Sequence, residues 1–139
     1  MSKKILFEEL VARREQREAD KLKIGELRIP GTDRTLEARM PSKKAVLELY
    51  GEMQAANTPL ELLECGKHAL YAVCPQLQDK SLQEALGVAE DPMAIVDALF
   101  SEPEQDLLGG RALRFLGLIP SDVDSGDTQP DTASETVKN

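Results

Sequence analysis

The residues best suited to chemistry in this chain gather around its single histidine, His68. Glu64 and Glu61 precede it by four and seven positions, so all three side chains fall on one side of a helix. A carboxylate beside an imidazole can orient it as a general base. The same spacing also describes an ordinary surface contact, which stabilises a helix by about 0.2–0.5 kcal/mol. With no second histidine to complete a site, we predict no catalytic role for this group.

The two cysteines, Cys65 and Cys74, are the other candidates for chemistry. Cys65 can approach His68 on a helix, but acidic neighbours at positions 61 and 64 raise a thiol pKa rather than lower it. On one helix the two cysteines lie about 13 Å apart, beyond disulfide reach. The sequence contains neither C-x-x-C nor H-x-x-x-H, the spacings of common zinc sites. We predict two buried thiols in a protein that is no enzyme and has no catalytic, cofactor-binding or metal-ligating residue.

Two further segments could host a ligand. The pair Gly109-Gly110 lies inside a predicted helix and fits neither G-x-G-x-x-G nor the P-loop, so we expect a kink or a close helix approach there. The stretch "CPQLQDKS", residues 74–81, joins two helical patterns. Pro75 ends the first helix and Leu77 is an apolar plug, which favours a structural corner over an active-site loop.

Length and composition indicate one small globular domain with a tail. The chain has 139 residues, 41% of them hydrophobic, and only 4% aromatic. Its formal charge of −8 disfavours binding to nucleic acid, because phosphate contacts need clustered Lys and Arg. The N-terminus is too charged for a signal peptide, and no segment approaches the length of a membrane span. We expect a cytosolic protein that binds neither nucleic acid nor membrane.

The first forty residues predict a helical arm followed by a β-hairpin. Residues 3–19 form a helix with a short apolar stripe and then a charged half, "ARREQREAD", which is either solvated or awaiting a partner. Alternating apolar residues on both sides of Pro30-Gly31-Thr32-Asp33 predict the hairpin, with a bulge at Gly25. Two strands alone are marginally stable, so the hairpin must lie on helices or pair with another chain.

The remaining chain predicts short, well-capped helices. Their expected starts are Ser42, Thr58-Pro59, Ser81, Asp91-Pro92 and Ser101, and the last ends at Gly117. The predicted fold is mainly α, with five to six short helices and one N-terminal β-hairpin, in the α+β class. We divide the chain into an N-terminal helical arm (1–19), a hairpin-plus-helical domain (20–120) and a disordered acidic tail (121–139). The tail holds five acids and one lysine, a formal charge of −4.

The order of these features resembles a known family. Within "ALYAVCPQLQDKSLQEALGVAEDPMAIVDALFSEPEQDLLGGRALRFLGL", a Pro-x-Leu-x-Asp corner precedes a short helix ending at Gly-Val. An acidic-Pro helix start and a final helix closing on Leu-Gly-Leu follow. With the hairpin and "MPSKKAVLELY", this resembles the XkdN-like family of phage tail assembly chaperones over about residues 20–118.

The resemblance implies a function in protein contact. Such a chaperone binds the tape measure protein and keeps it soluble until tail tube subunits polymerise around it, so the tube protein is a second potential partner. It acts in the cytoplasm of the bacterial host and is not expected in the mature virion. In several such phages a frameshift near the end of the gene produces a longer form of the chaperone.

We expect the partner to contact apolar side chains of the arm and of the last helices: Phe7, Leu10, Val11, Leu99, Phe100, Leu107 and Leu108. The alternative is that all seven belong to the core. Two other functions stay open, a minor structural tail protein and an unrelated cytosolic adaptor or regulator. Pairing of the hairpin across subunits, and with it a homo-oligomer, is also open.

Overall fold

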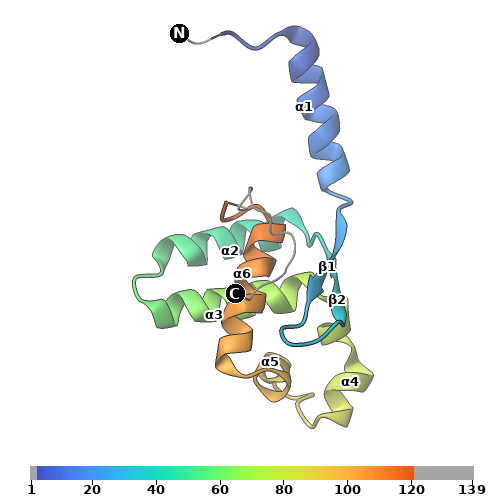
Figure 1. The fold of residues 1–139 in the computed structure, drawn as a ribbon, viewed down its shortest axis with the longest axis vertical. Helices are drawn as coiled ribbons and strands as arrows, with labels where there is room; N and C mark the ends of the chain where they lie inside the picture. The colour runs from blue at the N-terminus through green and yellow to red at the C-terminus, as the bar shows by residue number, and fades with distance from the viewer. Residues whose placement is uncertain (1–2, 121–139) are drawn as a thin grey trace.

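The computed structural model describes residues 3–120, and the predicted disordered tail lies outside the described residues. Within them the chain forms six α-helices, one 3-10 helix and a two-stranded antiparallel sheet (Figure 1). The predicted α+β fold, mainly helical with an N-terminal hairpin, is therefore confirmed. The elements are, in order, α1 (Phe7–Asp20), β1 (Ile24–Arg28), β2 (Thr35–Arg39), α2 (Lys43–Ala55), α3 (Pro59–Val73), η1 (Pro75–Gln78), α4 (Lys80–Ala85), α5 (Ala94–Leu99) and α6 (Glu102–Phe115).

Helix α1 is an arm that projects from the rest of the described chain (Figure 1). It begins at Phe7 rather than at the predicted residue 3, because the Glu9 carboxylate accepts a hydrogen bond of 2.8 Å from the Leu6 N–H. That bond satisfies one of the N–H groups that a helix start leaves without an internal partner. No residue of α1 is buried.

The hairpin pairs in regular register, with Leu27 opposite Leu36 and Gly25 opposite Ala38. The bulge predicted at Gly25 is wrong, because β1 and β2 pair residue by residue through this position. Packing against α6 explains the glycine instead. A side chain at Gly25 would lie 3.0 Å from the Phe115 ring, so the glycine leaves room for that ring on the buried face. Lys23 adds a second link, donating a hydrogen bond of 2.9 Å to the Phe115 carbonyl.

The main helices start and end where their sequence signals predict. Ser42, Thr58 and Ser101 each accept a hydrogen bond from the backbone N–H three residues later, which caps α2, α3 and α6. Gly117 adopts φ 78°, and the Leu118 N–H donates to the Leu113 carbonyl at 3.0 Å. This left-handed cap ends α6 as expected.

The two short helices start elsewhere than predicted. The N-cap of α4 is Asp79 rather than Ser81, because the Asp79 carboxylate accepts from the Leu82 N–H at 3.1 Å. Asp91-Pro92 does not open α5 directly. A turn in which the Ala94 N–H donates to the Asp91 carbonyl comes first, and α5 begins at Ala94.

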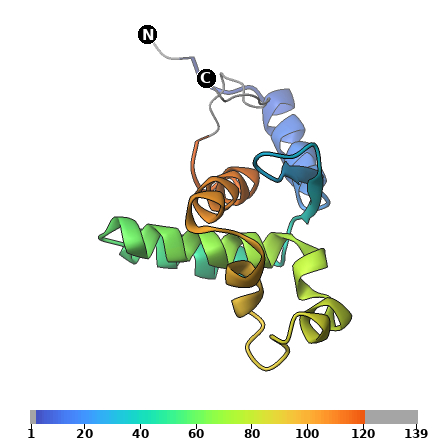
Figure 2. The same cartoon turned by 60° about the horizontal axis from the view of Figure 1, so that its bottom comes forward.

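One core joins the hairpin to the helices. Helix α6 crosses α3, and α2 runs beside α3. The segment from η1 to α5 forms the end of the helical body that lies away from α1 (Figure 2). Gly66 and Gly109 meet where α3 and α6 cross, which confirms the close helix approach expected at the glycine pair. The largest fully buried side chains are Leu70, Val73, Leu77, Ile95, Val96 and Leu108.

The stretch "CPQLQDKS" is a packed corner in the structure. Leu77 is 1% exposed, as a plug should be. Gln76 accepts a hydrogen bond of 2.9 Å from the Glu37 N–H of β2, and Gln78 donates to the carbonyls of Tyr71 and Ala72. Each of these contacts connects the corner to a neighbouring element, so both glutamines of the corner have structural partners.

Candidate functional site: an exposed apolar arm

The largest run of exposed apolar side chains lies at the start of the arm. We call it the apolar arm end, and it consists of Ile5, Leu6, Phe7, Leu10 and Val11. Phe7 is 77% exposed and Leu10 is 52% exposed. Exposed single leucines are common on protein surfaces, but a contiguous apolar patch usually marks a contact site.

Helical spacing places these side chains together. Leu6 and Leu10 are four residues apart, as are Phe7 and Val11, so each pair lies on neighbouring turns of one helix face. Charged residues predominate in the rest of α1, and Glu18 forms an ion pair of 3.1 Å with Lys21, the residue that follows the helix. A free-standing helix of 14 residues is only marginally stable in water, so this arm would gain stability from a partner.

Only part of the predicted partner-binding set lies on the surface. Phe7, Leu10 and Val11 are exposed on α1, and Leu99 and Leu107 are 39% and 49% exposed on α5 and α6. Phe100 and Leu108 are 8% and 0% exposed and belong to the core, which corrects their assignment as contact residues. On α6 the helical period explains the difference, since the consecutive residues Leu107 and Leu108 point to different faces. Phe100 follows the last residue of α5 in an extended conformation.

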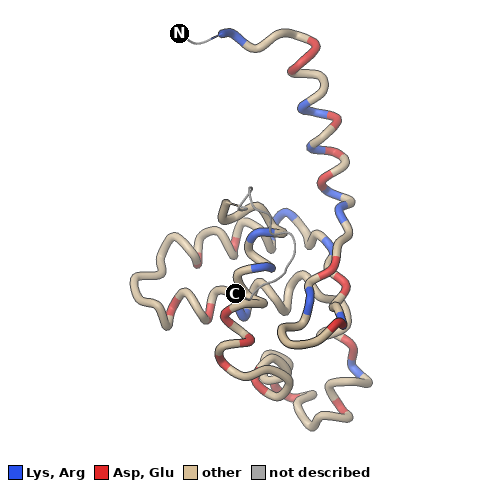
Figure 3. Tube along the Cα trace, in the orientation of Figure 1, with Lys and Arg blue, Asp and Glu red and all other residues tan. Residues whose placement is uncertain are grey.

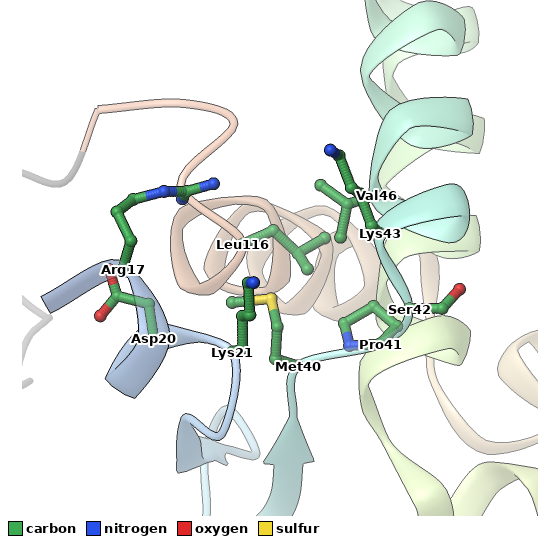
Figure 4. Close-up of a pocket in the computed structure, with 9 residues that line it drawn as sticks. All are labelled: Arg17, Asp20, Lys21, Met40, Pro41, Ser42, Lys43, Val46 and Leu116. Carbon is green, nitrogen blue, oxygen red and sulfur yellow. The ribbon is translucent and has the colours of Figure 1, made fainter. Parts of the chain in front are cut away.

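A second feature, which the sequence pattern did not reveal, is a groove where the arm meets the body. This junction groove has a volume of about 430 Å³ and lies between the ends of α1 and α6 and the start of α2 (Figure 4). It is lined by Arg17, Asp20, Lys21, Met40, Pro41, Ser42, Lys43, Val46 and Leu116. Three segments far apart in the sequence build it, so no local motif could have predicted it.

The side chains of the junction groove divide into an apolar floor and a basic rim. Met40, Val46 and Leu116 supply apolar surface. Arg17 and Lys21 extend toward Leu116, whereas the carboxylate of Asp20 points away from it (Figure 4). Figure 3 shows further basic residues at the adjoining ends of α2 and α6, while acidic residues predominate around α4, α5 and the start of α6.

The histidine pairs with a residue that its own helix does not supply. The Nδ1 atom of His68 lies 2.6 Å from Glu52 Oε2 on α2, rather than next to the predicted partners Glu61 and Glu64. Glu61 instead accepts a hydrogen bond of 2.6 Å from the Asn57 N–H at the start of α3. The His68–Glu52 contact therefore links two helices, and both side chains are more than a third exposed.

Both cysteines are buried and free, which confirms their predicted structural role. Burial raises the pKa of the Cys65 thiol, and the nearby Glu52 carboxylate raises it further. Burial alone raises the pKa of Cys74 to about 12. A thiol must lose its proton to act as a strong nucleophile, so these environments hold both sulfurs in the unreactive form.

A polar network crosses the interface between α3, α5 and α6. Lys67 donates to Glu64 and Asp97, and these bonds outweigh the opposing effect of burial and raise the pKa of Lys67. Gln105 donates to Asp97 at 3.0 Å and to the Phe100 carbonyl at 2.8 Å. The hydrogen bond from Gln105 and the one from Lys67 lower the pKa of Asp97. The network fixes α5 against its two neighbours.

Over residues 3–120, no group of three or more His, Cys, Asp or Glu side chains is arranged to hold a metal ion. None of the helices in the same range combines the length and the apolar character needed to cross a membrane.

Comparison with known proteins adds no relative. No protein-family model, no curated protein sequence and no solved structure matches the chain.

Proposed function

We propose that this protein is a phage tail assembly chaperone that binds the tape measure protein and keeps it soluble during tail assembly. The observation that carries the proposal is the apolar arm end, with Phe7 77% exposed on a helix that buries none of its residues. The order of corner, caps and closing helix, which resembles the XkdN-like family, supplies the identity of the partner.

The physical basis is a helix that lacks a surface to pack against. An amphipathic helix presents apolar residues at i, i+3 and i+4, and a second helix of the same kind covers them. A tape measure protein is long and helical, and its apolar stripes need cover until the tail tube encloses it. Leu6 and Leu10 with Phe7 and Val11 offer two turns of such cover.

The charge of the chain fits this role. At a formal charge of −8, free copies repel one another, which limits the self-association that an exposed apolar segment invites. The proposed site of action is the cytoplasm of the bacterial host. The tail tube protein is a second proposed partner, met when the chaperone hands over its client.

The experiment is co-expression with a candidate tape measure protein, with its soluble fraction as the measurement. We expect the soluble fraction to rise with the wild-type chain and to fall back with the double variant Phe7→Ser/Leu10→Ser. Leu60→Ser is the matched control, because Leu60 is 68% exposed on α3 but lies outside the arm.

Two results would overturn the proposal. One is an unchanged insoluble fraction of the tape measure protein in the presence of the wild-type chain. The other is the presence of the protein in purified phage particles at a fixed ratio, which a minor structural tail protein would show and a chaperone would not.

A further inference from the structure

The junction groove offers positive charge within an acidic protein. Arg17, Lys21 and Lys43 carry three positive charges on its rim against the single carboxylate of Asp20. Lys21 also pairs with Glu18 at 3.1 Å, but both groups are more than half exposed and an ammonium has three donors. The rim can therefore accept further carboxylates.

The floor of the groove is apolar and partly uncovered. Met40, Val46 and Leu116 line it, and each of the first two is only partly buried. A segment that fills this groove must combine one apolar side chain for the floor with acidic groups for the rim. Burying an apolar side chain of valine size contributes about 1.5–3 kcal/mol.

The chain itself contains such a segment close by. Directly after the last described residue, Pro120, the sequence reads Ser121-Asp122-Val123-Asp124, with one apolar residue between two acids. Leu116, on the groove floor, precedes Val123 by seven residues, which span up to about 25 Å. The residues 121–139 together hold five acids and one lysine, opposite in sign to the rim.

We propose that Asp122-Val123-Asp124 binds in the junction groove of its own chain, with Val123 on the floor and the two aspartates on the basic rim. Because a short connection holds the segment near the groove, its effective concentration there is in the millimolar range. Weak individual contacts are therefore enough to keep the segment bound in the groove. The bound segment links the C-terminal end of α1 to the start of α2 and the end of α6. This contact lies within one chain and does not require the tape measure protein.

The first test is zero-length carbodiimide cross-linking of the full chain, which joins lysine amines to carboxylates in direct contact. We expect cross-links from Lys21 and Lys43 to Asp122 and Asp124. Lys80 is the control, since it is exposed at the start of α4 and does not line the groove. We expect the yield of cross-links from Lys21 and Lys43 to be about ten times the yield from Lys80, which corresponds to a preference of about 1.4 kcal/mol.

The second test separates docking from long-range charge effects. The double variants Asp122→Asn/Asp124→Asn and Asp131→Asn/Glu135→Gln each remove two charges from the same segment. In amide NMR spectra of the full chain, we expect the first pair and Val123→Ser to shift the signals of Val46 and Leu116, and the second pair to leave them in place.

Three results would overturn the inference. One is equal cross-linking of Lys80 and the groove lysines. Another is equal shifts, or none, in the two double variants. The third is cross-links that join isotopically light and heavy chains in a mixture, since these would make a second copy the occupant of the groove.

Discussion

Gly66 and Gly109 lie in backbone contact at the crossing of α3 and α6. A Cβ atom on Gly109 would come within 2.8 Å of the Gly66 Cα, and one on Gly66 would come within 3.1 Å of the Gly109 Cα. Real Cβ contacts do not fall as short as the first distance, and backbone cannot rotate away as a side chain can. The two glycines therefore set how closely the helices pack.

Replacing Gly109 by alanine should destabilise the protein. Alanine stabilises a helix relative to glycine by about 0.8–1.0 kcal/mol. The added methyl group, however, forces two packed helices apart, which costs about 1–3 kcal/mol. We expect a net fall in the free energy of unfolding, measured by urea denaturation. Gly110→Ala is the control, because its new methyl group would meet only the Arg114 side chain at 3.6 Å and should stabilise the fold by about 0.5–1 kcal/mol. Equal effects of the two substitutions would contradict this account of the crossing.

The buried thiol of Cys74 should make the protein less stable at alkaline pH. Its pKa rises from 9.0 to about 12 on folding, so above pH 9 the unfolded chain has lost a proton that the native chain retains. The stabilisation is complete below pH 9 and decreases as the pH rises toward the folded value. Between pH 8 and pH 10, we expect Cys74 to reduce the free energy of unfolding by about 1.4 kcal/mol.

Urea denaturation at pH 8, 9 and 10 under reducing conditions measures this effect. Cys74→Ala should flatten the pH dependence by that amount, whatever it does to the absolute stability. Some alkaline slope should persist in the variant, because burial also raises the pKa of Cys65. A variant with the same slope as the wild type would contradict the assignment to Cys74.

The residues nominated for partner binding should separate into two classes when mutated. Leu108 is fully buried, so Leu108→Ala should lower the free energy of unfolding by about 2–5 kcal/mol. Leu10 is 52% exposed on the arm, so Leu10→Ser should change it by no more than about 0.5 kcal/mol. Urea denaturation measures both. A loss above about 1 kcal/mol for Leu10→Ser would mean that the arm packs on the body.

The local sequence determined the helices and their ends. Ser42, Thr58 and Ser101 cap helices as predicted, and Gly117 ends the last one, because each signal acts on backbone groups within three or four residues of itself. Asp79 replaced Ser81 as the cap of α4 for the same local reason, since either side chain can reach the free N–H groups. The burial of both cysteines was also predicted correctly, because a free cysteine usually behaves as a small apolar residue of the core.

Only the tertiary structure decided what these helices contact. His68 pairs with Glu52, which lies on another helix. Gly25 packs against the ring of Phe115, ninety positions later in the chain, and does not form a bulge. The division between exposed Leu107 and buried Leu108 followed from how α6 lies on α3. The junction groove exists because three distant segments converge. Hydrophobic period and capping act over a few residues, whereas contact partners depend on how whole elements pack, and packing is a property of the assembled core.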